Sequence, residues 1–363
     1  MGRKRLQEPA DGRPTVHTVA ARAGVSIASA SRVLNGVGGS AETIRKVRAA
    51  AAEVGYVPNA IARSLQSQRT GLIALAVEDI GNPVYVEMMR AIEAVVASSG
   101  RQLLVHATGG RIDNETALLR RLANRYVDGM IVSPIRVTDD HLAALVDSPV
   151  PVVVVGQLGE DTPVDNVRTD SRNGVALAVD HLVANGRHRI GFVNGPLDTV
   201  PGAARDAGFR SALARHGIPL DEDLIEVGDF QYAAGRAATE RLLARTDPDA
   251  LVCANDLIAV GALHALLAAG RPVPQDVALV GMDDTELARM MFPQLSSVSL
   301  GSAERGRRAA ELLLQRIADP TLPPRREQVP PSLAIRASSG TTPLVPRPAG
   351  PPTTQPSSEG VTA

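Results

Sequence analysis

Few side chains in this 363-residue chain have the types and spacing of a catalytic centre. The single cysteine, Cys253, follows aliphatic residues that predict a buried strand, where a thiol is more often structural than nucleophilic. His181 and His188 flank the end of a predicted helix, without the HExxH spacing or the carboxylate partner of a zinc site. The glycine-rich segment 36–39 lacks the lysine of a phosphate-binding loop. We therefore expect no catalytic residue, no metal and no cofactor, in a chain that is not an enzyme.

A second set of polar side chains has the types that hold a small polar molecule. Asp79, Asn255 and Asp283 each follow a short aliphatic run that predicts a strand. Ligands of open α/β sheets bind outside the carboxyl ends of the strands, so these side chains are candidates for a binding site. Asx side chains also cap loops routinely, and loop capping is the alternative interpretation of Asn255 and Asp283.

The charged side chains divide the chain into two unlike parts. Residues 1–70 hold eleven basic and four acidic side chains, a net charge of +7. The remaining residues carry 27 basic and 35 acidic side chains, a net charge of −8. A basic head on an acidic body is the electrostatic pattern of a nucleic-acid contact. A solvated basic tail would explain residues 3–5 alone, but not basic residues interleaved with periodic apolar ones.

Short helices are predicted within the basic part. Apolar residues recur with helical spacing over Val16–Ala23 and again after Ser26, a favourable N-cap, with Gly24 between the two segments. A third helix is expected from Ser40 to Gly55, which takes the position after the C-cap. Two short helices joined by a tight glycine turn form a helix-turn-helix, although any three-helix bundle can show the same spacing.

The rest of the chain alternates aliphatic runs with longer amphipathic segments. This alternation predicts parallel sheets in doubly wound α/β domains, and about 270 residues suffice for two such lobes. The predicted strands are Ile73–Val77, Gln102–His106, Gly129–Val132, Pro151–Val155, Arg189–Val193, Leu251–Cys253 and Val277–Val280. The predicted helices include Val84–Ser99, Ser171–Asn185, Gly202–His216, Gln231–Arg245, Asp256–Ala269 and Ser302–Ala318.

Composition limits the class of protein. The chain is 44% hydrophobic but only 2% aromatic and has no Trp, so its core must consist mainly of Ala, Val, Leu and Ile. One cysteine excludes an internal disulfide framework. No apolar run approaches the ~18 residues of a membrane span, and no apolar signal core follows the basic N-terminus, so we expect a soluble cytoplasmic protein with no membrane partner.

The segment TVHTVAARAGVSIASASRVLN at 15–35, followed by YVPNAIARSL at 56–65, resembles the head and hinge of the lactose-repressor (LacI/GalR) family of bacterial transcription regulators. The resemblance continues through 167–196, 254–256 and 280–285 and covers about residues 15–340. It implies a helix-turn-helix head followed by a periplasmic-binding-protein-like body of two lobes. The chain should cross between these lobes near 165–170, 294–300 and 328–332.

The resemblance also assigns candidate DNA contacts. The second helix would enter the major groove, where Ile27 and Ala28 can meet thymine methyls, Ser29 can donate or accept, and Arg32 can read a guanine. The positions that match phosphate contacts of the family are Thr15, Ser26, Ser31, Asn35, Tyr56 and Asn59. Residues 60–66 would form a hinge helix on operator DNA. Ala62 belongs to this interface, and Leu65 from each of two subunits would wedge into the minor groove.

The effector site follows from the same resemblance. Arg205, Phe230, Asn255 and Asp283 match positions that bind effector in sugar-responsive members, whereas Leu300 stands where many of those members have Gln. Asp79 and Tyr85 are further candidates. An arginine, a carboxylate and an amide can together satisfy several hydroxyls, and an aromatic face can pack on the C–H surface of a sugar.

These features predict a repressor of carbohydrate-utilisation genes that binds a palindromic operator as a homodimer and is released by a sugar-like effector. The alternatives are control by a nucleobase or nucleoside, control by a partner protein acting as corepressor, and a solute-binding transport protein. No apolar heptad that could form a tetramer occurs near the C-terminus. The expected boundaries are 1–14 for a basic flexible tail, 15–58 for the DNA-binding domain, 59–71 for the hinge, 72–340 for the effector-binding and dimerisation domain, and 341–363 for a disordered tail.

Overall fold

The computed structural model describes residues 14–57, 69–122 and 126–340. The chain divides into two compact units, Met1–Leu72 with Arg125–Asp128, and Ile73–Asn124 with Gly129–Ala363. We call the helical part before residue 58 the head, and the two sheets with their helices the body. The predicted hinge contacts Asn59, Ala62 and Leu65 lie outside the described residues, as does the expected tail 341–363.

Helices α1 (Val16–Ala23), α2 (Ile27–Leu34) and α3 (Ala41–Glu53) form the head. Each begins at a hydroxyl N-cap, because the side chains of Thr15, Ser26 and Ser40 accept hydrogen bonds from the backbone N–H three residues later. Gly24 ends α1 in the left-handed conformation with φ +66°, which lets the chain turn at once into α2.

The head has a small apolar core. Its buried members are Val19, Ala20, Ala30, Val33, Val47 and Ala50. At the surface, the guanidinium of Arg22 on α1 donates two hydrogen bonds to the carboxylate of Glu53 on α3. The three helices thus bury one face each against a common centre, and their other faces remain in contact with solvent.

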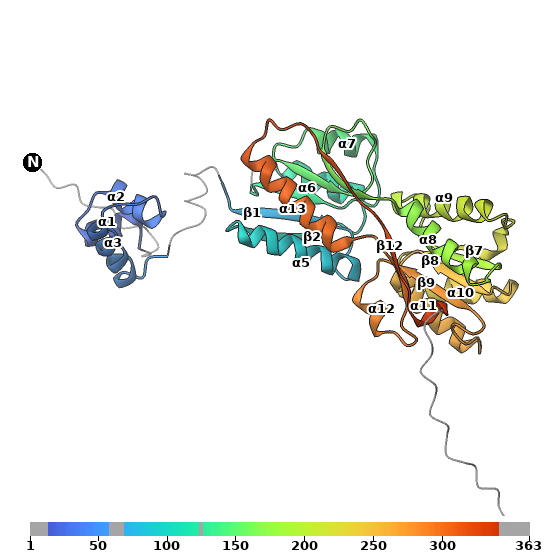
Figure 1. Cartoon of the computed structure of the whole chain (residues 1–363). Coiled ribbons are helices and arrows are strands. Elements are labelled where there is room, and N and C mark those ends of the chain that lie inside the picture. The colour runs from blue at the N-terminus through green and yellow to red at the C-terminus, as the bar shows by residue number, and fades with distance from the viewer. Residues whose placement is uncertain (1–13, 58–68, 123–125, 341–363) are drawn as a thin grey trace, which may run out of the picture. The chain divides into compact units, whose positions relative to one another are not determined.

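The body contains two lobes, each built on a six-stranded sheet (Figure 1). The first lobe comprises β1 (Leu72–Val77), β2 (Gln102–Ala107), β3 (Gly129–Val132), β4 (Val152–Val155), β5 (Asp165–Thr169) and β11 (Arg326–Val329), with α5 (Pro83–Ser98), α6 (Ile112–Arg121), α7 (Asp139–Val146) and α13 (Ser302–Ala318). The second comprises β6 (Ile190–Asn194), β7 (Ile225–Val227), β8 (Ala250–Cys253), β9 (Ala278–Met282), β10 (Ser296–Ser299) and β12 (Ser332–Ala334), with α8 (Ser171–Ala184), α9 (Val200–Arg215), α10 (Tyr232–Arg245), α11 (Asp256–Ala268) and α12 (Glu286–Met290).

The two sheets have the same strand order. It is β2-β1-β3-β4-β5-β11 in the first lobe and β7-β6-β8-β9-β10-β12 in the second. The order reverses between β1 and β3 and again between β6 and β8, and each reversal opens a crevice at the carboxyl ends of the strands. The chain passes between the lobes after β5, after β10 and between β11 and β12, so the predicted crossings are confirmed.

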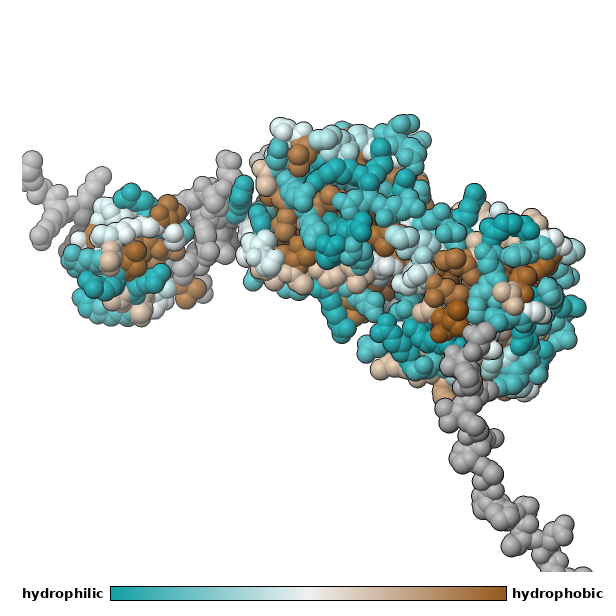
Figure 2. Space-filling view, viewed as in Figure 1, coloured by the Kyte–Doolittle hydropathy of each residue, from teal (hydrophilic) through white to brown (hydrophobic). Residues whose placement is uncertain are grey.

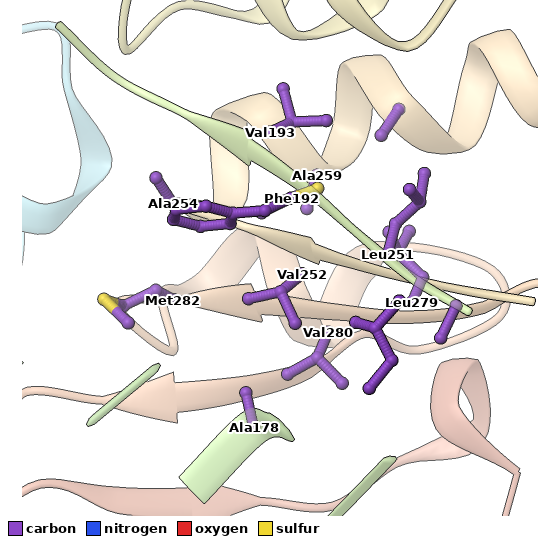
Figure 3. Packing of buried hydrophobic residues seen from close by; sticks show 14 of the residues in the cluster. Ala178, Phe192, Val193, Leu251, Val252, Ala254, Ala259, Leu279, Val280 and Met282 are labelled. Atoms are coloured by element: carbon purple, nitrogen blue, oxygen red, sulfur yellow. The ribbon is translucent and has the colours of Figure 1, made fainter. Parts of the chain in front are cut away.

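The core of the second lobe is almost entirely aliphatic (Figure 3). Val252 and Val280 from neighbouring strands pack beside each other, and Phe192 stacks on Phe209 with ring centroids 4.7 Å apart. Cys253 is buried in this core, where desolvation raises the pKa of its thiol far above the usual range. A thiol that stays protonated at neutral pH is a poor nucleophile, so Cys253 has a structural role.

Two glycines let α10 and α11 pack closely. A Cβ at Gly235 would lie 2.6 Å from Cα of Ile258, and one at Gly261 would lie 2.3 Å from the carbonyl oxygen of Tyr232. This close approach places the starts of the two helices side by side, and the Asn255 amide donates to the Phe230 carbonyl oxygen over 3.0 Å. Two candidate binding residues are thereby fixed against each other.

The visible surface of the body is mostly hydrophilic, with apolar patches interrupted by polar side chains (Figure 2). No helix formed by residues 14–57, 69–122 and 126–340 is both long and apolar enough to cross a membrane.

Candidate functional site

Helix α2 presents the side chains predicted to read bases. Ile27, Ala28 and Arg32 are exposed, and Ser29 is half-buried. Ile27 is 44% exposed and does not belong to the small apolar core of the head. The other face of α2 supplies Ala30 and Val33 to the core, so the face with Ile27, Ala28 and Arg32 is free to contact a partner.

The predicted phosphate contacts within the described residues lie on α2, at helix ends of the head and beside its core. The Ser26 hydroxyl caps α2 and lies 2.9 Å from the Ser29 hydroxyl, and the Asn35 amide donates to the Ser31 hydroxyl over 3.3 Å. Thr15 caps α1, and Tyr56 packs against the core of the head. Those that cap a helix therefore order that helix end, and a hydroxyl in such a position can still donate its proton to a phosphate oxygen.

The body contains a cavity of about 630 Å³ between its lobes. Glu78 and Ser133 line it at the carboxyl ends of β1 and β3, and Asn255 lines it at the end of β8. These are the places where the strand order reverses, the expected location of a ligand site in such sheets. Further lining side chains are Asn82, Tyr85, Arg168, Thr169, Asp170, Arg172, Arg205, Phe230, Asp283, Leu300, Arg305 and Gln328.

Of the six predicted effector residues, the structure brings five together in this wall: Tyr85, Arg205, Phe230, Asn255 and Asp283. Asp79 does not line the cavity. One of its carboxylate oxygens accepts from the Gly81 amide at 2.8 Å and the other from the side chain of Gln231 at 3.4 Å. Asp79 therefore orders a turn, and its neighbour Glu78 lines the cavity.

Asn255 caps a helix and also lines the cavity. Its side-chain oxygen accepts from the Ile258 amide at 2.8 Å, which caps α11, and its amide donates to the Phe230 carbonyl. The side chain is 2% exposed, so these bonds fix its orientation before any ligand enters. Loop capping is thus its structural role, at a place where it also lines the cavity.

Asp283 is the buried carboxyl of the cavity. It follows β9 with φ 101°, a conformation that costs a residue with a side chain energy and that concentrates at functional sites. Burial raises the pKa of Asp283 to about 7, although the Arg205 guanidinium, with its nearest nitrogen 3.9 Å away, opposes the shift. Near neutral pH this group can therefore either accept or donate a hydrogen bond.

Arg205 lies over the ring of Phe230, with the guanidinium carbon 5.6 Å from the ring centroid. The ring in turn packs on the backbone at Gly195, where a Cβ would come within 2.2 Å of it. Burial lowers the pKa of Arg205, whereas Asp283 raises it. A guanidinium is nevertheless always charged in proteins, so the cavity wall contains a desolvated positive charge beside an aromatic face.

Sequence reasoning missed six ionisable groups of the wall, which are Glu78, Glu160, Arg168, Asp170, Arg172 and Arg305. Arg305 is 8% exposed and lies on the buried face of α13 together with Ala309 and Leu312. The sequence contained a signal for this burial, because Arg305 is a charged residue at an apolar position of a predicted amphipathic helix. Glu78 comes directly after β1, and burial raises the pKa of its carboxyl.

Contacts beside the cavity connect the two lobes. Arg136, which follows β3, donates to the carboxylate of Asp198 from the second lobe over 2.8 Å. Nearby, the Val200 amide at the start of α9 donates to the Ile135 carbonyl over 2.8 Å. Across the described residues, no group of three His, Cys, Asp or Glu side chains is arranged to hold a metal ion.

Two family models match the chain. Residues 15–59 match the bacterial regulatory proteins of the lacI family, and residues 179–339 match a periplasmic binding protein-like domain. The first match contains the three helices of the head, and the second contains most of the second lobe together with α13 and β11 of the first.

Relatives and solved structures extend the match over both parts of the chain. The HTH-type transcriptional regulator CelR of Thermobifida fusca is 37% identical over 336 residues, which cover 90% of this chain and 98% of CelR. The solved CelR–cellobiose complex covers 90% of this chain and 100% of its own, with a TM-score of 0.69 and 35% identity. The Lac repressor dimer bound to operator and the anti-inducer ONPF has a TM-score of 0.81 and 28% identity, and covers 90% of this chain and 99% of its own. The chain belongs to the LacI family and is a DNA-binding transcriptional regulator, not an enzyme.

Proposed function

We propose that this regulator represses carbohydrate-utilisation genes in the cytoplasm by binding a palindromic operator as a homodimer, and that a sugar-like effector in the interlobe cavity releases it. The observation that carries the proposal is the cavity wall, which combines Arg205, Asp283 and the Phe230 ring. The relatives support it, because CelR is solved with cellobiose and the Lac repressor as a dimer on its operator.

The chemistry of the wall suits a sugar. A cavity of about 630 Å³ is within the range that small-molecule sites occupy. Guanidinium and carboxylate groups can form several hydrogen bonds with ring hydroxyls, and the Phe230 face can pack against C–H groups. Since these groups are already held in place by packing and capping, ligand binding orders few side chains.

In the head, the exposed face of α2 would read the operator. Ile27 and Ala28 are assigned to thymine methyls, Ser29 and Arg32 to base edges, and the surrounding hydroxyl and amide side chains to phosphates. A two-fold dimer would place two copies of α2 on the two half-sites. The domain boundaries expected from the sequence form part of the same proposal.

Effector and operator are coupled only if the effector binds the operator-competent and operator-incompetent states with different affinities. The three strand crossings are the elements through which a change in the angle between the lobes can occur. We propose that the effector acts as an inducer, which lowers operator affinity and releases DNA. A corepressor would instead raise operator affinity.

A thermal-shift screen of the full chain against sugars, acidic sugars and nucleosides tests the proposal. A ligand at 100 times its Kd stabilises the protein by about 2.7 kcal/mol, which raises Tm by several degrees. A sugar that raises Tm and that Arg205→Met no longer binds supports the assignment. A response to nucleosides alone would replace sugar by nucleoside, and silence across the panel with well-folded, DNA-binding protein would instead favour a protein corepressor.

A further inference from the structure

Arg305 is a buried charge for which the described residues supply no hydrogen-bond or ion-pair partner. Its side chain lines the cavity from the first turns of α13 and is 8% exposed. Its Nε is fully buried and has no hydrogen-bond partner, and among the described residues its guanidinium forms neither a hydrogen bond nor an ion pair. Burial of a charge without a partner is among the costliest arrangements in a folded protein.

A second guanidinium of the same cavity is almost as poorly satisfied. Arg205 is 6% exposed, its Nε also lacks a partner, and its nearest carboxylate oxygen, on Asp283, is 3.9 Å away. The charges of Arg205 and Arg305 lie close enough for Arg205 to lower the pKa of Arg305. The two cations therefore repel each other inside a desolvated space.

The acidic side chains of the wall do not balance these two charges. Asp283 is the carboxyl that acts on both, but its pKa of about 7 leaves it only partly ionised at neutral pH. Glu160 accepts a hydrogen bond from Arg168 at 2.7 Å, and Asp170 caps α8 by accepting from the Asn173 amide at 2.9 Å. Glu78 is not among the groups that shift the pKa of either arginine.

We propose that the effector is an acidic sugar, and that its anionic group, a carboxylate or a phosphate, binds between the guanidinium groups of Arg205 and Arg305. This inference rests on the proposed sugar-like effector and specifies its class. A guanidinium offers two parallel N–H donors to the oxygens of a carboxylate or phosphate, and such charge-assisted pairs are the strongest hydrogen bonds in proteins. A neutral sugar would leave the charge of Arg305 unpaired in the complex.

The remaining wall would hold the sugar ring. Phe230 supplies the aromatic face, Asp283 and Tyr85 supply hydroxyl partners, and Leu300 contributes an apolar side chain that is 3% exposed. An apolar neighbour lowers the local dielectric constant and strengthens the attraction between the anion and the two arginines.

Isothermal titration calorimetry of the full-length protein at pH 7 tests the proposal with matched probes. The probes are glucose with glucuronate and glucose 6-phosphate, galactose with galacturonate and galactose 6-phosphate, and cellobiose with cellobionate. In at least one set the acidic member should bind at least tenfold more tightly than the neutral one. The preferred member also separates a carboxylate from a phosphate as the anionic group.

Arg305→Met should reduce the ratio of acidic to neutral affinity at least tenfold, and Arg305→Lys should keep part of it. Arg307→Met is the matched control. It removes the same charge two residues further along α13, where Arg307 is exposed and paired with Glu304 and Glu311, and it should leave the ratio unchanged. The Tm of ligand-free Arg305→Met should equal or exceed that of the wild type, because the substitution removes an unpaired buried charge.

Three results would overturn the proposal. A neutral sugar that binds better than its acidic counterparts, with the same ratio in Arg305→Met, would exclude an anionic effector but leave the sugar-like effector standing. A large fall in the Tm of ligand-free Arg305→Met would mean that the guanidinium already has a stabilising partner. If no probe bound to folded protein that still binds DNA, the sugar-like effector itself would be wrong, and the acidic class with it.

Discussion

The head and the body hold their binding groups in opposite ways. In the head, the side chains assigned to DNA lie on exposed helix surface, while a separate set that includes Val19, Ala30 and Val47 forms the core. In the body, the groups assigned to the ligand are themselves buried, with Arg205 at 6% and Asp283 at 7% exposure.

In the head, the side chains that stabilise the fold are different from those assigned to recognition. In the body, the same side chains affect both stability and ligand binding. A base-reading side chain of the head contributes little to its fold, because it makes few buried contacts. A charged side chain of the cavity has lost its water before the ligand arrives, so removing it alters both ligand affinity and the free energy of unfolding.

The largest expected effect is in the cavity. Arg205→Met should weaken effector binding about 100-fold, since it removes two charge-assisted hydrogen bonds of roughly 1.5 kcal/mol each. The operator affinity of ligand-free protein should stay the same, and calorimetry with gel-shift titration measures both. Arg210→Met on the same helix, where Arg210 pairs with Asp206 and Glu222, is the control. Unchanged effector affinity in Arg205→Met would remove Arg205 from the site.

The next effect is in the head. Arg32→Ala should cost about 1–3 kcal/mol of operator affinity and relax preference at one base pair, with Tm unchanged, because Arg32 is exposed. Binding to a library of operator variants measures both quantities. Arg45→Ala, which removes an equal charge from the surface of α3, should leave base preference intact. An unaltered base preference in Arg32→Ala would contradict the role assigned to α2.

The pH dependence of stability contrasts the cavity with a paired site elsewhere in the body. Burial raises the pKa of Asp283 to about 7 and of Asp256 to about 6, so these two carboxyls bind more protons in the folded protein than in the unfolded chain between about pH 4 and 7. Their contribution to the free energy of unfolding should therefore fall as pH rises through this window. Burial also tends to raise the pKa of Asp165, but hydrogen bonds from Arg316 and Arg325 lower it, so its contribution is lost only in acid.

Asp283→Asn tests this contrast directly. It should raise Tm at pH 8 relative to wild type by about 2–4 °C, the change that 1 kcal/mol produces in a domain of this size. The difference should decrease steadily as the pH falls from 8 towards 4, because Asp283 is protonated in the folded wild type below about pH 7 but in the unfolded chain only below about pH 4. Thermal unfolding at pH 5, 6, 7 and 8 measures it, and a difference independent of pH would contradict the assigned cause. Arg205, Arg305, Tyr85 and Asp256 face this carboxyl and remain in the variant.

The smallest effect separates folding from base reading within the head. Ser40→Ala removes the N-cap of α3 and should cost about 1 kcal/mol of head stability. Hydrogen exchange of the α3 amides in the full chain measures the loss, and Ser40→Asn should restore protection. Base preference should not change, so an altered preference would mean that α3 contributes to base reading.

The sequence was most informative where local rules decide the structure. Ser26, Ser40 and the glycines at 24 and 55 marked the helix ends of the head, and aliphatic runs marked the central strands of both sheets. The predicted helix Ser302–Ala318 is found with the same bounds. Short edge elements such as β7 (Ile225–Val227), whose middle residue is Glu226, carry too little apolar pattern to be recognised.

The cavity was only partly predictable, because its wall depends on packing between distant segments. Asp79 was chosen at the end of the first strand, but successive residues of an extended chain point to opposite sides, and Glu78 is the one that lines the cavity. The position of Arg305 on the apolar face of α13 could be read from the sequence, but that this face lines the cavity depends on the packing of α13 beside α5, which is not a local property. Arg205, Phe230 and Asp283 were identified through a family resemblance, and the roles of individual residues remain predictions.

The most direct test of the account is the operator affinity of the full chain with and without a ligand in the cavity. The operator would be selected from randomised DNA, and calorimetry would identify the ligand and establish its occupancy. We predict that ligand at a concentration that just saturates the wild type weakens its operator binding at least tenfold and leaves operator binding of Arg205→Met nearly unchanged. An operator Kd that is the same with the cavity empty and occupied would contradict the account.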